Sequence, residues 1–492
     1  MHHPSYSDET PIAAIATPLA ESGLALIRGS GKGAIDLVAL VFSRPRSLLE
    51  APGNTIVYGW ILRRSTAELH QDGLDADHFG GEKIDEVLIS VYRGPRSFTG
   101  EDGVDISCHG GIAAVRAVMG VLLQAGFRHA LPGEFTFRAF MNGKLDLTRA
   151  ESVMELVSAK TDRGREHAVN RLSGVLEGEI RGIKALLVQV LAGTELYLDY
   201  SEDEFMETRP GDHEAAGRLP DRALAAEALI RVRALAASYR MERLYHDGAL
   251  VVIAGRPNAG KSSLFNLLLK EERSIVTDIP GTTRDWIEAW ISIEGIPIRL
   301  ADTAGLHTLE YPAQDQVETI GMERSRELLG ESDLILYVIN GIEGITKEDR
   351  DFFHEHSQGH TAPIITLWNK IDTTPLPAEP AVHSAGPVFG ISAKTGEGIP
   401  ELTALIAAAL SNPGAAQGRE LAPGIGSDRQ KALIDLAAAS LEEALALADQ
   451  MRPLDIIAPL LREGMNALGE ITGEVSTADI LEVMFSRFCV GK

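Results

Sequence analysis

The sequence predicts a multi-domain protein that combines α/β domains with an α-helical domain, and three observations support this. The chain has 492 residues, which is more than one hydrophobic core usually supports. A short apolar run, a glycine-rich loop and a helical stretch follow one another at residues 249–272, and later apolar runs alternate with helical stretches. This alternation is typical of a doubly wound sheet. Because helical patterns lie on both sides of it, an inserted α/β domain should interrupt one helical domain.

Residues 1–130 should form an N-terminal α+β domain. Apolar runs at 12–16, 24–27 and 86–92 have the length of strands, and glycine-containing turns separate them. Residues 113–123 have the apolar spacing of a helix.

Residues 131–245 should form the first part of the helical domain. A helical pattern begins near Asp146, where Thr148 and Glu151 have the spacing of a capping box, and it predicts one long helix or a helical pair. Residues 207–221 are polar and contain both Pro and Gly, so a loop is expected there before helical patterning resumes.

Residues 246–411 should form the inserted α/β domain, and residues 412–492 the second part of the helical domain. The elements expected in the insert are strands at 249–254, 334–339 and 364–368, a helix at 261–272, and a hairpin of 286–293 with 296–300. After a linker at 411–426, a helix should place one apolar face inward, consisting of Leu433, Leu436, Ala437, Leu441 and Ala444.

Composition limits the classes of function. The formal net charge of −24 argues against broad electrostatic binding of nucleic acid, so any RNA contact should be local or shared with a partner. Only two cysteines occur, too few for a disulfide framework or a thiolate metal cage. No long apolar run or signal-peptide pattern is present, which predicts a cytoplasmic protein that does not enter a membrane.

Residues 255–262 (GRPNAGKS) fit the phosphate-binding pattern G-x-x-x-x-G-K-[ST], and they lie between an expected strand and an expected helix. In such a loop, backbone amides surround phosphate oxygens, Lys261 meets the outer phosphates and Ser262 ligates magnesium. A chance glycine turn is the alternative, and three further motifs argue against it.

Residues 302–305 (DTAG) follow an expected strand and place a carboxylate near the magnesium shell and a glycine amide near the γ-phosphate. Residues 369–372 (NKID) resemble the guanine-reading motif of the GTPase superfamily, and residues 392–394 (SAK) resemble its last base-contacting loop. Four motifs in this order predict a Ras-like P-loop GTPase domain. A scaffold that binds GTP without hydrolysing it remains the alternative.

The expected GTP-binding residues come from these motifs and from the segment between them. They are Asn258, Ala259, Gly260, Lys261, Ser262, Ser263, Thr277, Asp278, Ile279, Pro280, Gly281, Thr282, Thr283, Asp302, Thr303, Ala304, Gly305, Asn369, Lys370, Asp372, Ser392, Ala393 and Lys394.

Further motifs point to one family. They are residues 275–285 (IVTDIPGTTRD), 98–102 (FTGED), 108–111 (CHGG), 132–136 (PGEFT), 142–147 (NGKLDL), 469–474 (GEITGE) and the terminal 488–492 (FCVGK). With these motifs nearly the whole chain resembles the MnmE family of tRNA uridine-modification GTPases.

The resemblance implies an N-terminal domain that dimerises and binds 5-formyl- or 5,10-methylene-tetrahydrofolate, and a GTPase domain inserted in the helical domain. It further implies a homodimer, a flavin-dependent partner (MnmG) that carries FAD, and tRNA as substrate. The two proteins would add an aminomethyl-type group to C5 of the wobble uridine, a base exposed in a loop. Potassium-stimulated GTP hydrolysis, through dimerisation of the GTPase domains, would drive the conformational change.

The resemblance also implies metal ligands and a catalytic acid. Ser262 and Thr283 match magnesium ligands of the family. Glu318 matches the acid that orients the attacking water, although residues 306–317 before it form a longer segment than usual. A potassium ion would stabilise charge at the transferring phosphate. The matching potassium positions are Asn258, Thr277, Ile279 and Thr282.

For the tetrahydrofolate, the matching positions are Arg28, Glu101, Lys144 and Lys492. Residues 18–23 depart from the glycine- and arginine-rich loop common in the family, so folate contact near Glu21 is not expected to follow the family pattern. Cys489 beside the terminal lysine is a candidate nucleophile, because a nearby cation lowers the pKa of a thiol. A small packed or substrate-lining residue is the alternative for Cys489.

Two other functions compete with this prediction. An assembly factor of the ribosome-associated GTPase type would use the same loops as a switch, but it should carry a basic RNA-binding appendage. A folate-binding dimer with a vestigial GTPase would require broken nucleotide motifs, and none of the four is broken.

Overall fold

A computed structural model describes residues 6, 9–64, 81–199, 219–271, 288–302, 327–357, 362–377, 387–411, 422–474, 481, 484–486 and 488–491. The chain divides into two compact units. The first consists of Met1–Met154, Ile180–Pro220 and Ala446–Lys492, and the second of Glu155–Glu179 and Asp221–Leu445.

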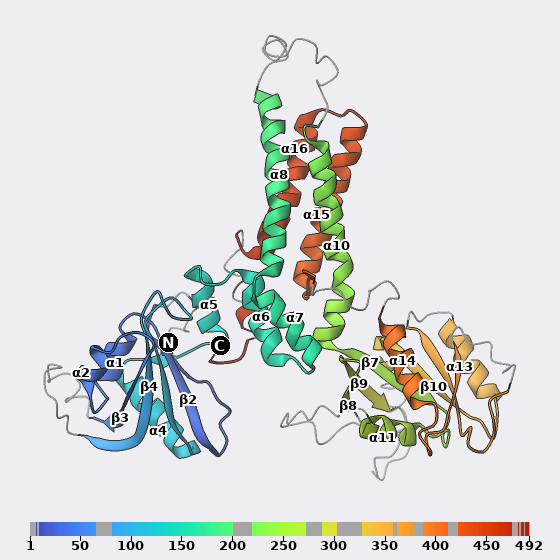
Figure 1. Cartoon of the computed structure of the whole chain (residues 1–492), viewed down its shortest axis with the longest axis horizontal. Coiled ribbons are helices and arrows are strands. Elements are labelled where there is room, and N and C mark those ends of the chain that lie inside the picture. Colours follow the sequence, from blue (N-terminus) through green and yellow to red (C-terminus); the bar gives the residue numbers. More distant parts are fainter. Residues whose placement is uncertain are drawn as a thin grey trace. The chain divides into compact units, whose positions relative to one another are not determined.

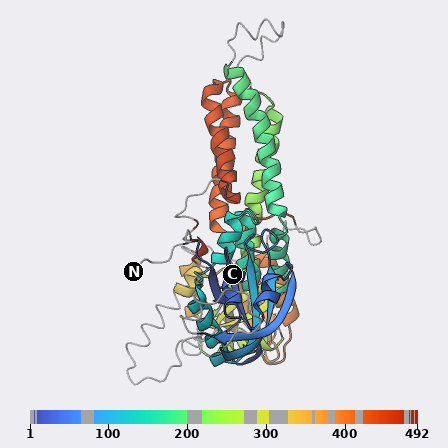
Figure 2. The same cartoon turned by 90° about the vertical axis from the view of Figure 1, so that its left-hand side faces the viewer.

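The first unit contains a six-stranded sheet in the order β3-β4-β5-β2-β1-β6, coloured blue to cyan in Figures 1 and 2. Neighbouring strands are antiparallel except for β1 and β6, which are parallel. The strands are β1 (Ile12–Ile15), β2 (Ser22–Ser30), β3 (Thr55–Arg63), β4 (Glu82–Tyr92), β5 (Gly103–Gly110) and β6 (Arg128–His129). The helices that accompany them are α1 (Ala34–Ala39), α2 (Pro45–Leu49) and α4 (Ile112–Ala125).

The core of this domain forms where α4 meets the sheet. Val118 and Leu122 of α4 are buried against Ile27, Ile89 and Ile106 of three strands. Along each strand, the residues next to these isoleucines point to the opposite face of the sheet. Such alternation is expected when one face of an antiparallel sheet is covered. The expected N-terminal α+β arrangement is confirmed.

Two more helices follow in the first unit, α5 (Glu134–Met141) and the start of α6 (Leu147–Ser158). A small aromatic cluster joins α6 to the end of the chain: Leu147 packs with Phe485 and Phe488, and all three are buried. Phe485 and Phe488 are therefore part of a packed core, and Phe485 also meets Phe137 of α5 with ring centroids 5.4 Å apart.

Later in the first unit, the part of α8 (Val175–Asp199) from Ile180 onward and α16 (Leu454–Thr472) lie side by side (Figure 1). An ion pair of 2.7 Å joins Arg462 to Glu195, and a second ion pair joins Lys184 to Glu474. Segments more than two hundred residues apart in the chain thus meet, as an inserted domain requires.

The second unit contains a six-stranded sheet in the order β12-β11-β10-β7-β9-β8, which is parallel except for the β8–β9 hairpin. Its strands are β7 (Ala249–Gly255), β8 (Glu288–Ile293), β9 (Ile296–Asp302), β10 (Leu334–Asn340), β11 (Ile364–Asn369) and β12 (Val388–Ile391). Separate hydrophobic clusters cover its two faces, one with α11 (Lys261–Glu271) and α14 (Ile399–Leu410), the other with α13 (Lys347–Ser357). The predicted doubly wound sheet is confirmed.

Helices flank this sheet in the sequence: α7 (Asp162–Leu172) and α10 (Arg222–Asp247) precede it, and α15 (Asp428–Asp449) follows it. Within the second unit, Arg171 of α7 is buried between two carboxylates, at 2.6 Å from Glu155 and in contact with Glu242 of α10. Arg233 of α10 lies 2.8 Å from Glu442 of α15. A Cβ on Gly426 would lie 2.9 Å from Glu155 and 3.3 Å from Arg171, so the chain returns to the helical segments beside the buried ion cluster around Arg171.

Three helical expectations are wrong in detail. The pattern from Asp146 forms three helices, α6, α7 and α8, in place of one or two. Asp146 caps α6, because its carboxylate accepts the backbone N–H of Thr148 at 2.8 Å, whereas Thr148 lies inside the helix. A carboxylate is a better partner for a helix N-terminus than a hydroxyl, since it also meets the helix dipole.

The buried face of α15 also differs from the expectation. Leu436 is 44% exposed, and Ile434 is buried in its place together with Ala437, Leu441 and Ala444. Spacings of three and four residues keep those positions on one stripe, whereas Leu436 is rotated away from it.

Among the described residues, no helix combines the length and hydropathy needed to cross a membrane.

Candidate functional site

The phosphate-binding loop lies between β7 and α11, and two glycines shape it. Gly255 has φ +139° and Gly260 has φ +101°, conformations that side chains rarely adopt. A Cβ atom on Gly255 would overlap the carbonyl of Val338, and one on Gly260 would overlap the side-chain amide of Asn369. At both glycines the loop backbone therefore packs so closely against Val338 and Asn369 that no side chain fits between them.

Lys261 begins α11 and points back into the loop. Its ammonium donates to the carbonyl oxygens of Gly255 at 2.7 Å and Arg256 at 2.8 Å, and only 6% of the residue is exposed. Burial lowers the pKa of Lys261, and the charge of Asp302 opposes this effect. A cation held inside the loop lies within reach of any phosphate that the loop surrounds.

Ser262 and Asp302 meet beside the loop. The hydroxyl of Ser262 donates to Oδ2 of Asp302 at 2.8 Å. Asp302 is the last residue of β9 and is paired with Ile253 of β7, so its carboxylate lies at the carboxyl edge of two adjacent parallel strands, where it meets Ser262 of α11. Hydroxyl and carboxylate oxygens are the ligand types that magnesium prefers, so this pair fits a magnesium site.

An ion-pair network that the sequence did not reveal holds the loop from outside. Arg256 lies 2.8 Å from Glu343 and 3.3 Å from Asp349, and Asp349 is fully buried. The hydroxyl of Tyr337 also donates to Asp349 at 2.9 Å. No short motif signals this contact, because its members lie on the loop, on β10, on α13 and on the segment between β10 and α13, which only the fold brings together.

Asn369 ties the phosphate side of the site to the base side. Its amide donates to the carbonyl of Ala259 at 2.8 Å, and its Oδ1 accepts the backbone N–H groups of Lys370 at 2.8 Å and Ala393 at 2.9 Å. Only 2% of Asn369 is exposed. One buried side chain thus fixes three of the predicted nucleotide motifs relative to one another.

Asp372 and Ser392 face each other at the outer end of the site. The hydroxyl of Ser392 donates to Oδ1 of Asp372 at 2.8 Å, and this hydrogen bond lowers the pKa of the carboxyl. Lys370 (φ +73°) donates from Nζ to the carbonyl of Asn258 at 3.2 Å. An ionised carboxylate that only accepts hydrogen bonds suits a ligand edge made of N–H donors.

Part of the predicted site lies outside the described residues. The described positions are Asn258, Ala259, Gly260, Lys261, Ser262, Ser263, Asp302, Asn369, Lys370, Asp372, Ser392, Ala393 and Lys394, which belong to the loops at one edge of the sheet. The predicted positions outside them are Thr277, Asp278, Ile279, Pro280, Gly281, Thr282, Thr283, Thr303, Ala304, Gly305, Glu318 and Lys492.

The N-terminal domain has a cavity of about 200 Å³ next to the predicted folate residues. Arg28 lies in its wall and forms a two-pronged ion pair with Asp105, at 2.9 and 3.2 Å. Glu101, on the adjoining segment, accepts the hydroxyl of Ser30 at 2.9 Å, and Lys144 donates to the carbonyl of Pro95 at 2.9 Å. The cavity is lined mainly by β2, β5 and residues 97–99.

Comparison with known proteins identifies the family. The family model for the MnmE helical domain matches residues 147–489, and that for the N-terminus of the GTP-binding protein TrmE matches residues 11–144. The tRNA modification GTPase MnmE of Treponema denticola is 42% identical over 503 aligned positions, which cover 99% of each chain. That of Symbiobacterium thermophilum is 40% identical and covers 98% of this chain and 100% of its own. This chain belongs to the MnmE family.

Membership confirms the family predicted from the motifs, the inserted Ras-like P-loop domain and a GTP hydrolase. The individual site residues, and the domain boundaries at 130, 245 and 411, remain predictions.

The C-terminal tail of this MnmE-family chain lies against α5. The backbone N–H of Gly133 donates to the carbonyl of Cys489 at 3.3 Å. A Cβ on Gly133 (φ +67°) would come within 2.7 Å of both the Phe485 carbonyl and Cβ of Phe488. Cys489 itself is exposed. The second cysteine differs: Cys108 is buried, and burial raises the pKa of its thiol to about 11, which does not favour a nucleophile.

The close approach of Gly260 to Asn369 leads to a prediction. Gly260→Ala should weaken GTP binding by at least about a hundredfold, since the new methyl must displace the amide that links the motifs and the backbone is strained at positive φ. Nucleotide affinity can be measured with a fluorescent GTP analogue. Gly330→Ala is the matched control, because a Cβ there meets no atom within 4 Å. Equal GTP affinities in Gly260→Ala and Gly330→Ala would contradict the close approach of Gly260 to Asn369.

Proposed function

We propose that this chain hydrolyses GTP in order to drive modification of the tRNA wobble uridine, with the two reactions in different domains. The observation that carries the proposal is the position of Asn369, which joins the phosphate loop through Ala259 to the base-side loop through Ala393. A nucleotide held at both ends is aligned for attack on its outer phosphate. The MnmE relatives are named as tRNA modification GTPases, which supports the assignment.

On the phosphate side, Ser262 and Thr283 would hold a magnesium ion, and Lys261 would stabilise charge on the outer phosphates. The fit rests on the Ser262 hydroxyl, which lies 2.8 Å from the Asp302 carboxylate next to the loop. The ion supplies charge stabilisation for the phosphate oxygens. Loop amides and Lys261 add donors that need no rearrangement when charge develops.

Hydrolysis would also depend on potassium. The proposed ligands are Asn258, Thr277, Ile279 and Thr282, with Glu318 orienting the attacking water. Of these, Asn258 belongs to the described part of the chain. It lies in the loop with φ +62°, and its backbone carbonyl accepts a hydrogen bond from Nζ of Lys370. A monovalent cation there supplies the positive charge that an arginine provides in other GTPases.

The N-terminal domain would bind a one-carbon tetrahydrofolate through Arg28, Glu101, Lys144 and Lys492. A cavity of about 200 Å³ is smaller than most sites for drug-sized ligands, so it fits the ring system of a folate better than the whole molecule. Most of the cavity surface is apolar, which suits the faces of a ring system. The polar groups of Arg28, Asp105 and Thr99 in its wall suit a ring edge that carries both donors and acceptors.

The chain would act as a homodimer with the flavoprotein MnmG, and tRNA would be the shared substrate. The net charge of −24 supports a shared tRNA site, because a chain this acidic repels the phosphate backbone over most of its surface. A basic partner surface would supply the missing attraction.

Potassium dependence gives the direct test. Glu318→Ala should lower the rate of GTP hydrolysis in potassium by at least about a hundredfold while GTP affinity is unchanged, since the residue acts on water and not on the nucleotide. The wild-type rate should fall in sodium. Glu331→Ala, a change of the same kind at a described residue outside the nucleotide motifs, serves as control. Equal wild-type rates in the two salts would argue against the cation mechanism.

The tail gives a second test of the proposal. Deletion of residues 488–492 should abolish wobble-uridine modification and leave GTP hydrolysis intact, because the tail packs in the first unit and the phosphate loop lies in the second. Mass spectrometry of wobble uridines from cells that carry the truncated chain measures the first effect. Normal modification in those cells would remove Cys489 and Lys492 from the reaction.

A further inference from the structure

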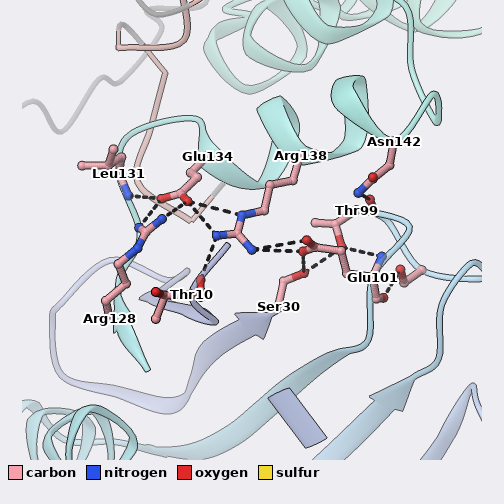
Figure 3. Close-up of polar contacts among 10 residues, drawn as sticks. Thr10, Ser30, Thr99, Glu101, Arg128, Leu131, Glu134, Arg138 and Asn142 are labelled. Carbon is pink, nitrogen blue, oxygen red and sulfur yellow. Dashed lines mark hydrogen bonds and ion pairs between the residues drawn. The ribbon is translucent and has the colours of Figure 1, made fainter. Parts of the chain in front are cut away.

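Glu134, the first residue of α5, is a carboxylate with no exposed surface. Its two oxygens accept hydrogen bonds from Arg128 at 2.6 and 2.7 Å, from the backbone N–H of Leu131 at 2.9 Å, and from Arg138 at 3.0 Å. A buried charge is tolerated only with such partners, and losing one of them is costly. Glu134 is therefore the fixed centre of a charge network (Figure 3).

Arg138, one helical turn later, extends this network toward Glu101. Its Nη2 also donates to the carbonyl of Thr10 at 2.9 Å, and its Nη1 lies 3.3 Å from both carboxylate oxygens of Glu101 (Figure 3). Its side chain is 6% exposed. The guanidinium is thus held on one edge by Glu134 and Thr10, and the other edge faces Glu101.

Glu101 differs from Glu134 in that it faces outward. Its side chain is 25% exposed, and Ser30 donates to its Oε2 at 2.9 Å. Ser30 lies in the wall of the cavity and is itself hydrogen-bonded to Thr99 at 2.7 Å. The carboxylate therefore has a fixed side, toward Arg138 and Ser30, and an open side.

We propose that Arg138 is a positioning residue that orients the Glu101 carboxylate toward a tetrahydrofolate, with Glu134 holding Arg138 in place. The inference rests on the proposed folate function. A carboxylate aimed by a rigid partner accepts the paired N–H groups of an aminopyrimidinone ring without first losing rotational freedom.

The residue type matters for this role. A guanidinium presents its donors in one plane, so it contacts Glu134 and Glu101 at once in fixed directions. A lysine would keep the positive charge but would lack the planar set of N–H donors. Two arginines also balance two glutamates, so the site can bind a ring edge without an excess of positive charge.

Arg138 and Arg128 provide a matched pair of variants. Each donates to Glu134 through two nitrogens, and Arg138 also donates to Glu101, whereas Arg128 also donates to the carbonyl of His129 at 3.2 Å. Arg138→Gln in the full chain should raise the Kd for 5-formyltetrahydrofolate by about tenfold or more, the loss expected for a charge-assisted contact. Arg128→Gln should change it by less than about threefold, although both variants lower Tm.

Calorimetric titration with 5-formyltetrahydrofolate gives the affinities, and GTP turnover reports on the integrity of the other unit. Equal loss of affinity in both variants would show a merely structural role and overturn the proposal. So would an unchanged Kd in Arg138→Gln when Glu101→Gln raises it. If Glu101→Gln leaves the Kd unchanged, the folate assignment itself fails at this carboxylate. If Arg138→Gln does not fold, Arg138→Lys should still raise the Kd several-fold.

Discussion

Lys261→Met should lower the rate constant of GTP hydrolysis by about a thousandfold, the order expected when a preorganised charge at the reacting phosphate is removed. The ammonium of Lys261 is already held by the carbonyls of Gly255 and Arg256, inside the loop that should surround the phosphates. Methionine keeps the length and volume of the side chain without its charge. Single-turnover phosphate release, measured at saturating GTP, separates this effect from a loss of affinity.

Lys261→Met should not lower thermal stability, although it lowers the rate of GTP hydrolysis. Burial lowers the pKa of Lys261, so the folded state disfavours the charged form relative to the unfolded chain. This unfavourable contribution is fully present at pH values below the lowered pKa and disappears as pH rises past the ordinary lysine value. Lys261→Met should therefore unfold at an equal or higher temperature than wild type at pH 7, with a smaller difference at pH 11.

Lys270→Met at the exposed end of α11 is the control, since it makes the same chemical change on the same helix. It should leave hydrolysis within about twofold of wild type, as most surface substitutions do. A Lys261→Met variant that hydrolyses GTP normally would mean that the loop stabilises the phosphates by its backbone amides alone.

Asp372→Asn should exchange guanine for xanthine specificity, with a loss of GTP affinity of about a hundredfold or more, because a site built to accept two N–H groups is left facing donors. Asp372 is exposed at the outer end of the site, and Ser392 donates to its Oδ1. Asparagine keeps the shape and presents an amide, which matches a xanthine carbonyl. Affinities for GTP and xanthosine triphosphate give the test.

Asp351→Asn, on an exposed face of α13, is the matched control and should bind GTP normally. The prediction requires that xanthosine triphosphate binds Asp372→Asn more tightly than GTP does. Loss of both nucleotides would instead indicate that the Asp372–Ser392 contact serves only to hold the loop.

Local patterns were sufficient for much of the fold. The runs before Gly255, Asn340 and Asn369 are short, apolar and bounded by turn residues, so they could be assigned as buried strands before the structure was known. Glu294 and Gly295 both have positive φ, as a two-residue hairpin turn requires, and the sequence indicated that turn. Caps and helix faces were less reliable: Asp146 caps α6 in place of Thr148, and the exposure of Leu436 depends on which neighbours α15 meets.

The sequence by itself determined the nucleotide class and the family, because GRPNAGKS, DTAG, NKID and SAK are local motifs whose chemistry is set by residue type and spacing. Only the tertiary structure decided how those motifs are joined, through Asn369, and how Glu101 is held, through Arg138. The physical reason is that buried hydrogen bonds connect residues far apart in the chain. Spacing in sequence carries no information about such contacts until the sheets and helices have packed.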